Sequence, residues 1–443
     1  MITCKHFGSC GGCTYLDIPY QAELTQKEAT LRETMGPYGL RLEGLIQAPS
    51  PQGYRNKMEF AFGDEGKDGQ LALGIRKRRS YYEVATLENC VLIPDDFRQI
   101  ALKVQEYFRE TGEAFFHRKR HTGSLRHLVL RRGEFTGEVL INLSTTSGLV
   151  AELPPLISRL LGLQLNGQIV GILHSVNDGV ADTVKDEDVR ILHGCDYYHE
   201  RICGLDFTVS AFSFFQTNSA GAEALYGVVK DMATGANHAI AAAARLPDPH
   251  GHKPHFNTSS AVSYIAPHLA YDLYCGTGTI AQILSPSFNK VIGIELNPDA
   301  IKAAQENARL NNITNCEFYA GDVLAALSTN NSQAQNQKIL PNEMPDVVVV
   351  DPPRDGLHPK ALAKLIELAP PSIVYVACKP ASLARDMAAL AEAGYQPVRI
   401  VGVDMFPRTP HVEAVALLRR SNTKNHNEQF NMTHSCALNK VEI

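Results

Sequence analysis

The sequence predicts an α/β fold whose C-terminal half forms a Rossmann-like domain, and three observations lead to that prediction. Between residues 269 and 420, short apolar runs typical of buried strands alternate with stretches of helical character. One run, in LAYDLYCGTGTIA, passes through a glycine turn into a helix. Another, SIVYVACKP, ends on Cys378 before a proline. Because ligands bind at the carboxyl ends of strands in open sheets, a thiol there is placed for chemistry, with a buried structural cysteine as the alternative.

The overall composition limits the classes of protein that are possible. The chain of 443 residues is long enough for two or three domains. No apolar stretch approaches the ~20 residues of a membrane span, and the N-terminal MITCKHFGSC lacks the apolar core of a secretory signal. We therefore expect a cytoplasmic monomer that makes no membrane contact and keeps its ten cysteines reduced. Since the formal net charge is −5, any nucleic-acid binding must come from local basic patches.

Three cysteines near the start, Cys4, Cys10 and Cys13, follow the spacing C-x5-C-x2-C among glycines. Glycine tolerates the positive φ angles of a tight ligand loop, and Cys90 is the best candidate for a fourth thiolate. Four thiolates hold either Zn²⁺ or a [4Fe–4S] cluster. Zinc ribbons use two C-x2–4-C pairs, so this spacing favours the cluster. We predict an iron–sulfur segment made of residues 1–15 and the region of residue 90.

Residues 16–209 are predicted to form a small β-rich central domain, antiparallel or barrel-like, with one helix near 20–35 and another near 96–110. Its strand candidates are NKMEFAFG, LALGIR, HLVLRRG, GEVLINLST and IVGILHSVN. Residues 76–79 form a basic run, and residues 117–132 hold six Lys or Arg and no acidic residue. Two such runs beside aromatic residues favour an RNA-binding face that contacts phosphates over an ordinary solvated surface.

Residues 210–420 contain the Rossmann-like domain. The turn Gly276–Gly278 lacks the third glycine of a dinucleotide site, which suits S-adenosylmethionine because that molecule has no phosphate. Glu295 ends the second strand, where a carboxylate accepts hydrogen bonds from ribose hydroxyls. Asp322 ends the third strand, where the adenine edge would lie, and Asp351 begins an Asp-Pro-Pro motif after the fourth. Acids at successive strand ends are a much stronger signal than the glycine turn alone.

Two segments fall outside this pattern. Residues 235–268 carry five histidines without helical spacing or a companion cysteine pair, so an inserted surface loop is predicted and not a metal site. Residues 421–443 are predicted to be a disordered tail.

Taken in order, the motifs resemble the RNA 5-methyluridine (uracil-C5) methyltransferase family from about residue 4 to residue 420. They are the four cysteines, QTNSAGAEALY, DLYCGTGT, GIELNPDAI, DPPRDGL, YVACKP and HVEAVALL. More narrowly, the chain resembles the cluster-bearing branch that modifies 23S rRNA and lacks an upstream TRAM domain. One departure is Ala377-Cys378-Lys379-Pro380, where the family usually has Ser-Cys-Asn-Pro.

The resemblance implies a class I methyltransferase domain and assigns a role to each site residue. The nucleophile would be Cys378, the general base Glu413, the cluster ligands Cys4, Cys10, Cys13 and Cys90, and the cofactor contacts Gln216, Tyr274, Glu295, Asp322 and Asp351. Glu413 lies in a buried-looking run, where an unpaired charge would be costly without a function.

The activity implied is transfer of a methyl group from S-adenosylmethionine to C5 of a uridine in RNA, with 23S rRNA as the expected substrate. Addition of Cys378 to C6 would make C5 nucleophilic, and Glu413 would then remove the C5 proton. Methylation of a tRNA uridine or of RNA cytosine at C5 remains open. Two other classes are a radical S-adenosylmethionine enzyme, which typically shows C-x3-C-x2-C, and a non-catalytic RNA-binding protein, which would not need Cys378 and Glu413.

Overall fold

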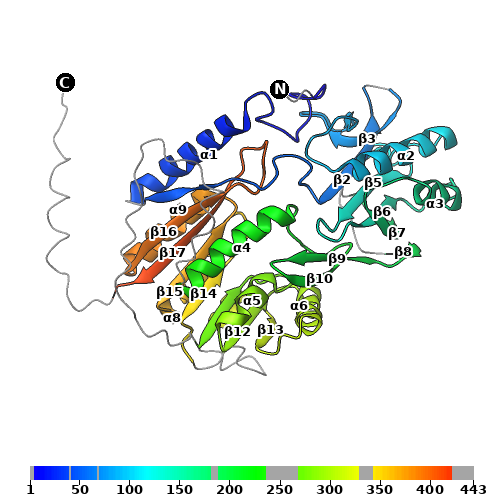
Figure 1. Ribbon diagram of the computed structural model, residues 1–443. Coiled ribbons are helices and arrows are strands. Elements are labelled where there is room, and N and C mark those ends of the chain that lie inside the picture. Colours follow the sequence, from blue (N-terminus) through cyan, green and yellow to red (C-terminus); the bar gives the residue numbers. More distant parts are fainter. Residues whose placement is uncertain are drawn as a thin grey trace, which may run out of the picture.

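The computed structural model describes residues 4–38, 41–66, 69–180, 188–235, 268–328 and 343–421. Almost all of the predicted 235–268 loop and of the 421–443 tail lies outside these residues. The described chain forms a larger body around one sheet and a smaller body around a second sheet, with a hairpin between them (Figure 1).

An eight-stranded sheet forms the larger body, in the order β1–β16–β17–β15–β14–β11–β12–β13. The strands are β1 (Leu42–Ile46), β11 (Leu269–Leu273), β12 (Lys290–Glu295), β13 (Cys316–Ala320), β14 (Val347–Val350), β15 (Ser372–Ala377), β16 (Tyr395–Val403) and β17 (Glu413–Arg420). Strands β11 to β15 pair in parallel, whereas β17 runs antiparallel to both β15 and β16. The direction of winding reverses between β11 and β14, which is where α/β sheets bind ligands.

Helices cover both faces of this sheet. On one face lie α4 (Ser219–Thr234), α5 (Thr279–Leu284) and α6 (Pro298–Leu310). On the other lie α1 (Tyr20–Met35), α7 (Val323–Leu327), α8 (Pro359–Leu368) and α9 (Pro380–Glu392). Short 3₁₀ turns follow α1 and α5, at Gly36–Tyr38 and Ser285–Ser287. In β14, Val347 and Val349 join the first apolar cluster and Val348 and Val350 the second, which explains a strand of four valines.

The smaller body is an open seven-stranded sheet in the order β4–β3–β2–β5–β6–β7–β8. Its strands are β2 (Lys57–Asp64), β3 (Leu71–Arg76), β4 (Val84–Thr86), β5 (Leu125–Arg132), β6 (Glu138–Thr145), β7 (Gln168–Val176) and β8 (Val189–Gly194), and its helices are α2 (Asp95–Thr111) and α3 (Pro154–Leu161). Strands β6 and β7 pair in parallel because α3 provides the crossover between them. The sheet is therefore mixed rather than purely antiparallel.

The helix and strand at the N-terminus lie elsewhere than the sequence prediction put them. The prediction placed residues 20–35 in the central domain, but α1 packs on the larger sheet through Leu24, Leu31 and Met35. Strand β1 extends the same sheet, pairing in parallel with β16. Local periodicity indicates that a helix forms, but it does not say which sheet covers its apolar face.

A hairpin of β9 (Tyr197–Ile202) and β10 (Leu205–Ser210) stands between the two bodies (Figure 1). Its Phe207 and Val209 pack into the apolar cluster of the larger body. Among the described residues, no helix is long and apolar enough to cross a membrane.

Candidate active site

Strand pairing brings Cys378 and Glu413 to the same end of the larger sheet. Cys378 directly follows β15 and Glu413 begins β17, and these antiparallel strands pair Ala377 with Ala414. Cys378 is half-buried, whereas Glu413 is 4% exposed. Continued by one residue, this antiparallel register sets Cys378 opposite Glu413, so the two residues are neighbours.

The electrostatics of this corner favour protonated acids. Burial raises the pKa of Glu413 to about 8; the Asp351 carboxylate adds to the shift and the Arg354 guanidinium opposes it. Burial raises the pKa of Asp351 to about 7. The pKa of the Cys378 thiol is also raised, first by burial and then by Glu413 and Asp351, again against Arg354. Cys378 therefore carries its proton in the free protein at neutral pH.

A glycine turn follows β11 at the carboxyl end of the larger sheet. Tyr274, Gly276 and Gly278 all have positive φ, at 65°, 52° and 76°. A Cβ on Gly278 would come within 2.6 Å of the Phe318 ring, so glycine is required there. The Gly276 N–H donates to Glu295 Oε2 at 3.2 Å, which fixes the carboxylate at the end of β12 beside the turn.

Two further predicted cofactor residues, Asp322 and Gln216, lie after β13 and before α4. Asp322 follows β13 and is exposed, and its Oδ1 caps α7 by accepting from the Ala325 N–H at 3.0 Å. Gln216 precedes α4 and hydrogen-bonds the buried Tyr226 hydroxyl, whose pKa is raised first by burial and then by Asp351. Gln216 and Asp351 therefore both act on the Tyr226 hydroxyl group.

Two residues in this region did not enter the predicted site. Asp272, in β11, is fully buried; its Oδ2 accepts from the Ala281 N–H at 2.9 Å, and burial raises its pKa to about 8. Asp272 thus joins β11 to α5 across the glycine turn. In the sequence, the feature that could have indicated this role is the single acidic residue inside the apolar run LAYDL. Arg354 is the cation that opposes the raised pKa values of both Cys378 and Glu413.

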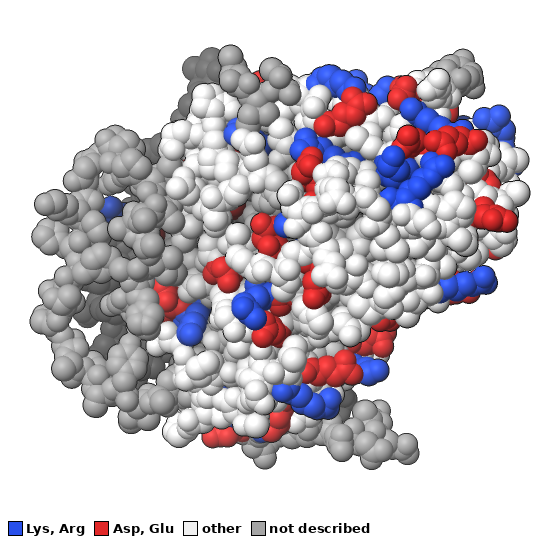
Figure 2. All heavy atoms as spheres, turned by 45° about the vertical axis from the view of Figure 1, so that its right-hand side comes forward, with Lys and Arg blue, Asp and Glu red and all other residues white. Residues whose placement is uncertain are grey.

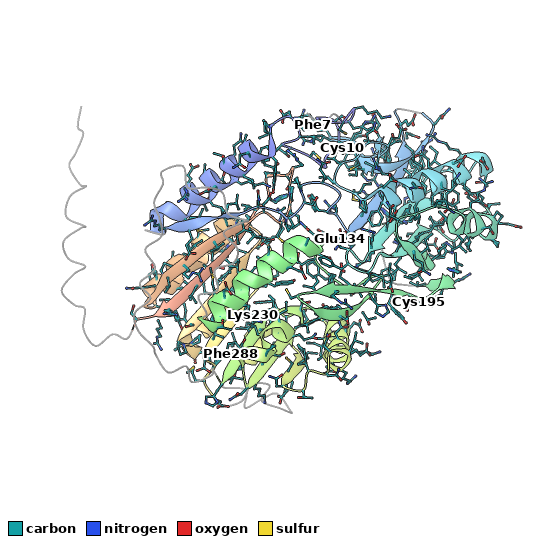
Figure 3. The ribbon with its side chains drawn as sticks, viewed as in Figure 1. Phe7, Cys10, Glu134, Cys195, Lys230 and Phe288 are labelled. Carbon is teal, nitrogen blue, oxygen red and sulfur yellow. The ribbon has the colours of Figure 1, made fainter. Side chains whose placement is uncertain are left out.

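Cys90 lies beside the three cysteines near the start of the chain. Cys4, Cys10, Cys13 and Cys90 line one cavity, together with His6 and apolar side chains that include Leu16 and Ile75. Cys10, labelled in Figure 3, lies where the N-terminal segment meets the smaller body. Burial raises the pKa of Cys10, Cys13 and Cys90, with Cys13 reaching about 12, and the neighbouring thiols add to each shift.

These cysteines do not stand in the arrangement of a metal site. Within the described ranges, no group of three or more His, Cys, Asp or Glu side chains has the geometry to hold a metal ion. The iron–sulfur cluster stays a prediction.

The basic runs are only partly on the surface. Arg126 and Arg131 are buried: Arg126 donates to the Asn177 and Gly179 carbonyl groups, and Arg131 to that of Ser213 at 2.6 Å. The exposed cations of the two runs are Arg78, Arg79, Lys119 and Arg120. Figure 2 shows basic side chains gathered towards the top of the face it presents, with acidic ones among them.

His117 begins the second basic run, residues 117–132, and its ring stacks on that of Tyr82 with the ring centroids 4.3 Å apart.

Comparison with known proteins identifies relatives over almost the whole chain. The family model described as tRNA (Uracil-5-)-methyltransferase matches residues 267–421. An uncharacterized RNA methyltransferase of Clostridium tetani is 40% identical over 95% of this chain and 84% of its own length. Another, from Clostridium acetobutylicum, is 39% identical over 94% of this chain and 83% of its own length.

A solved structure also resembles both bodies of the molecule. It is the Pyrococcus abyssi tRNA (uracil-54, C5)-methyltransferase in complex with S-adenosyl-L-homocysteine, with a TM-score of 0.69 and 27% sequence identity. The similarity covers 93% of this chain and 86% of that one. The sheet, its glycine turn and the full-length similarity lead to one conclusion: the chain is an RNA methyltransferase and belongs to the tRNA (uracil-5-)-methyltransferase family.

Proposed function

We propose that this protein methylates C5 of a uridine in RNA, with Cys378 as the nucleophile and Glu413 as the general base. The observation that carries the proposal is the pairing of β15 with β17, which sets a thiol next to a buried carboxyl group. A buried acid with a raised pKa beside a nucleophile is typical of a group that transfers protons. Membership of the uracil-5 family supports uracil rather than cytosine as the base.

The reaction divides into steps that these residues can perform. The Cys378 thiolate adds to C6 of the uracil, and the ring electrons displaced to C5–C4–O4 make C5 nucleophilic. S-adenosylmethionine supplies the methyl group to C5 and leaves as S-adenosylhomocysteine. Glu413 then accepts the C5 proton, and the electrons of that C–H bond restore the C5–C6 double bond as the Cys378 sulfur departs. The target uridine must be unstacked, at a cost of about a few kcal/mol.

The methyl donor is proposed to lie over the glycine turn. Its contacts would be Gln216, Tyr274, Glu295, Asp322 and Asp351. Glu295 supports this placement because the Gly276 and Asn297 N–H groups hold its carboxylate at 3.2 and 3.0 Å beside the turn. A sulfonium cation near Asp351 would favour ionisation of that carboxyl group and lower its pKa from about 7.

For the RNA substrate we propose 23S rRNA, with contacts from the exposed cations of the smaller body. The alternative is tRNA, which is the substrate named for the Pyrococcus abyssi relative. The two substrates are distinguished by mass-spectrometric mapping of 5-methyluridine in 23S rRNA and in tRNA from a strain that lacks this gene. Loss of the modified nucleoside from tRNA alone would rule out the ribosomal substrate.

We further propose a [4Fe–4S] cluster on Cys4, Cys10, Cys13 and Cys90. All four side chains line one cavity, and burial raises the pKa of three of these thiols. Because the described thiols do not have the geometry of a metal site, binding would have to draw them together and displace their protons. Anaerobically purified protein should contain about four iron and four sulfide per chain, and Cys90→Ser should reduce both. Stoichiometric zinc without iron would assign the site to Zn²⁺ instead.

The base and the nucleophile are tested with RNA labelled with tritium at C5 of either uridine or cytidine. We expect tritium release from the uridine label only, and none from either label with Cys378→Ala. Glu413→Gln should form a covalent protein–RNA adduct that fails to release tritium. Methylation that continues in Cys378→Ala would contradict the proposed mechanism.

A further inference from the structure

The segment that joins β16 to Glu413 is held from four directions. Residues 404–409, called the connector here, offer four consecutive carbonyl groups that all accept hydrogen bonds from other parts of the chain. The bonds are Asn218 Nδ2 to Met405 O (2.9 Å), Lys27 Nζ to Phe406 O (3.1 Å), Tyr54 Oη to Pro407 O (2.9 Å), and Thr14 N (2.7 Å) and Tyr15 N (3.2 Å) to Arg408 O. The donors lie at the start of α4, in α1, before β2 and just after Cys13.

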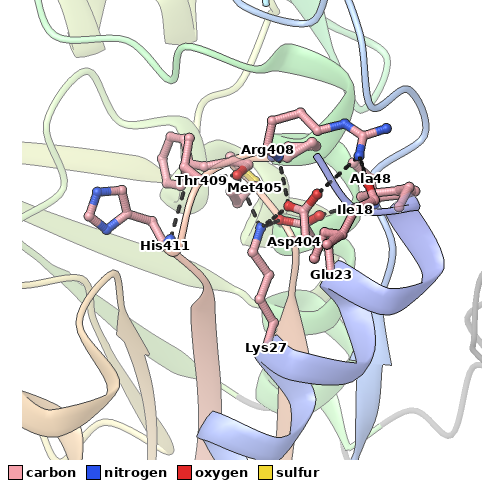
Figure 4. Close-up of polar contacts among 12 residues, drawn as sticks. Ile18, Glu23, Lys27, Ala48, Asp404, Met405, Arg408, Thr409 and His411 are labelled. Carbon is pink, nitrogen blue, oxygen red and sulfur yellow. Dashed lines mark hydrogen bonds and ion pairs between the residues drawn. The ribbon is translucent and has the colours of Figure 1, made fainter. Parts of the chain in front are cut away.

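A buried ion network lies under the connector (Figure 4). The Lys27 side chain is 1% exposed, and those of Glu23 and Asp404 are fully buried. Besides the Phe406 carbonyl group, the Lys27 ammonium group donates to Glu23 Oε1 at 2.8 Å and to Asp404 Oδ1 at 2.7 Å, so all three of its protons are used. Arg408 supplies the second cation, 3.6 Å from Glu23 Oε2. Buried charges are costly unless they are paired in this way.

The backbone of the connector is strained near its end, at Arg408. Arg408 has φ 68°, in the left-handed region that side chains other than glycine rarely adopt. Its N–H donates to Glu23 Oε1 at 2.7 Å, which holds it in that conformation. Strained residues persist where the surroundings over-determine them, and they gather at functional sites.

We propose that Lys27 is a positioning residue for Glu413. Through Asp404 and the Phe406 carbonyl group it fixes the connector, and the connector sets the place and direction of the Glu413 carboxyl group, five residues beyond Arg408. The inference rests on the proposed function, in which Glu413 removes a proton after Cys378 has bonded to the uridine. Lys27 does not touch the substrate, so its loss affects proton removal and leaves thiol addition intact. A displacement of about 1 Å can slow such a step by about 100-fold.

Lys27→Met is the test, because it keeps the length of the side chain and removes the charge. The variant is incubated with S-adenosylmethionine and C5-tritiated RNA from a strain lacking the gene, and both the covalent adduct and tritium release are followed. We expect adduct formation at a rate close to that of the wild type and tritium release slower by about 10- to 100-fold. Glu413→Gln should show the same pattern in a more extreme form.

A matched control separates positioning from stability. Met35→Ala removes a fully buried side chain from the same helix without touching the ion network. It should lower the melting temperature while keeping the wild-type ratio of adduct formation to release. If Lys27→Met does not fold, Tyr20→Phe serves instead, because it removes only the hydroxyl group that donates to Asp404 Oδ2 at 2.7 Å.

The outcomes are distinguishable. The positioning role would be overturned if Lys27→Met slowed adduct formation and tritium release by the same factor. Where Tyr20→Phe has to be used, a wild-type ratio of adduct formation to tritium release would overturn it. A wild-type protein that never forms an adduct would instead overturn the proposed function.

Discussion

Glu413 shows at the level of a single residue how burial prepares a base. Its pKa is raised to about 8, and a carboxyl group accepts a proton only when it is ionised. The rate at which the covalent adduct releases tritium should therefore rise with pH from 6 and level off above about 8. Single-turnover measurements of tritium release between pH 6 and 9 give the midpoint of this pH dependence.

Arg354→Met provides the matched variant for this profile. Arg354 is the cation that lowers the pKa of Glu413, so its loss should move the midpoint to higher pH. Arg190→Met, which removes an exposed cation from the smaller body, should leave the midpoint in place. A profile that is flat between pH 6 and 9 would contradict the role of Glu413 as base.

The positions of residues at strand ends can be predicted from the sequence, because a change from apolar to polar residues marks the end of each strand. Cys378, Glu295 and Asp351 all follow such changes. Arg126 and Arg131 were misjudged as surface cations because β5 is central in its sheet, and a run of charges does not reveal that. Asp272 was missed because a buried acid looks like an isolated polar residue until its partner on α5 is known.

At the level of elements, α9 links the nucleophile to the loop after β14. The helix starts two residues after Cys378, and its Asp386 is 2% exposed. The Asp386 carboxylate accepts from the Tyr375 hydroxyl at 2.6 Å and from the Leu357 N–H at 2.8 Å. Asp386 thereby fixes the far end of the loop that begins at Asp351.

Replacing Asp386 by Ala should leave both donors unsatisfied in a buried site. The expected cost is about 1–3 kcal/mol of stability for each buried donor, together with weaker binding of the methyl donor because the Asp351 loop loosens. Denaturant unfolding and calorimetric titration with S-adenosylhomocysteine measure the two effects. Lys364→Met, which removes an exposed ion pair on α8, is the control and should cost about 0–1 kcal/mol. Unchanged binding in Asp386→Ala would show that the loop is held by other contacts.

For the whole molecule, the sequence supports the order of the C-terminal strands but not the boundaries between bodies. Each parallel strand is a continuous apolar run, so it can be recognised locally. The pairing of β1 with β16 joins residues more than 350 positions apart, and nothing in either strand alone indicates it. The same holds for Lys27, whose partner Asp404 comes from the far end of the chain.

This arrangement predicts that the C-terminal part does not fold by itself. A fragment of residues 196–421 keeps the hairpin and seven of the eight strands but lacks α1 and β1. It would expose the apolar face now covered by Leu24, Leu31 and Met35, and it would leave β16 as an open edge strand. We expect this fragment to bind a hydrophobic dye and to unfold without cooperativity. Fusing residues 16–48 to it through a flexible linker should restore a cooperative transition, because those residues supply the missing strand, the covering helix and the partners of Asp404. If the fragment 196–421 unfolded cooperatively without residues 16–48, the sheet would be stable without α1 and β1, and the prediction would be wrong.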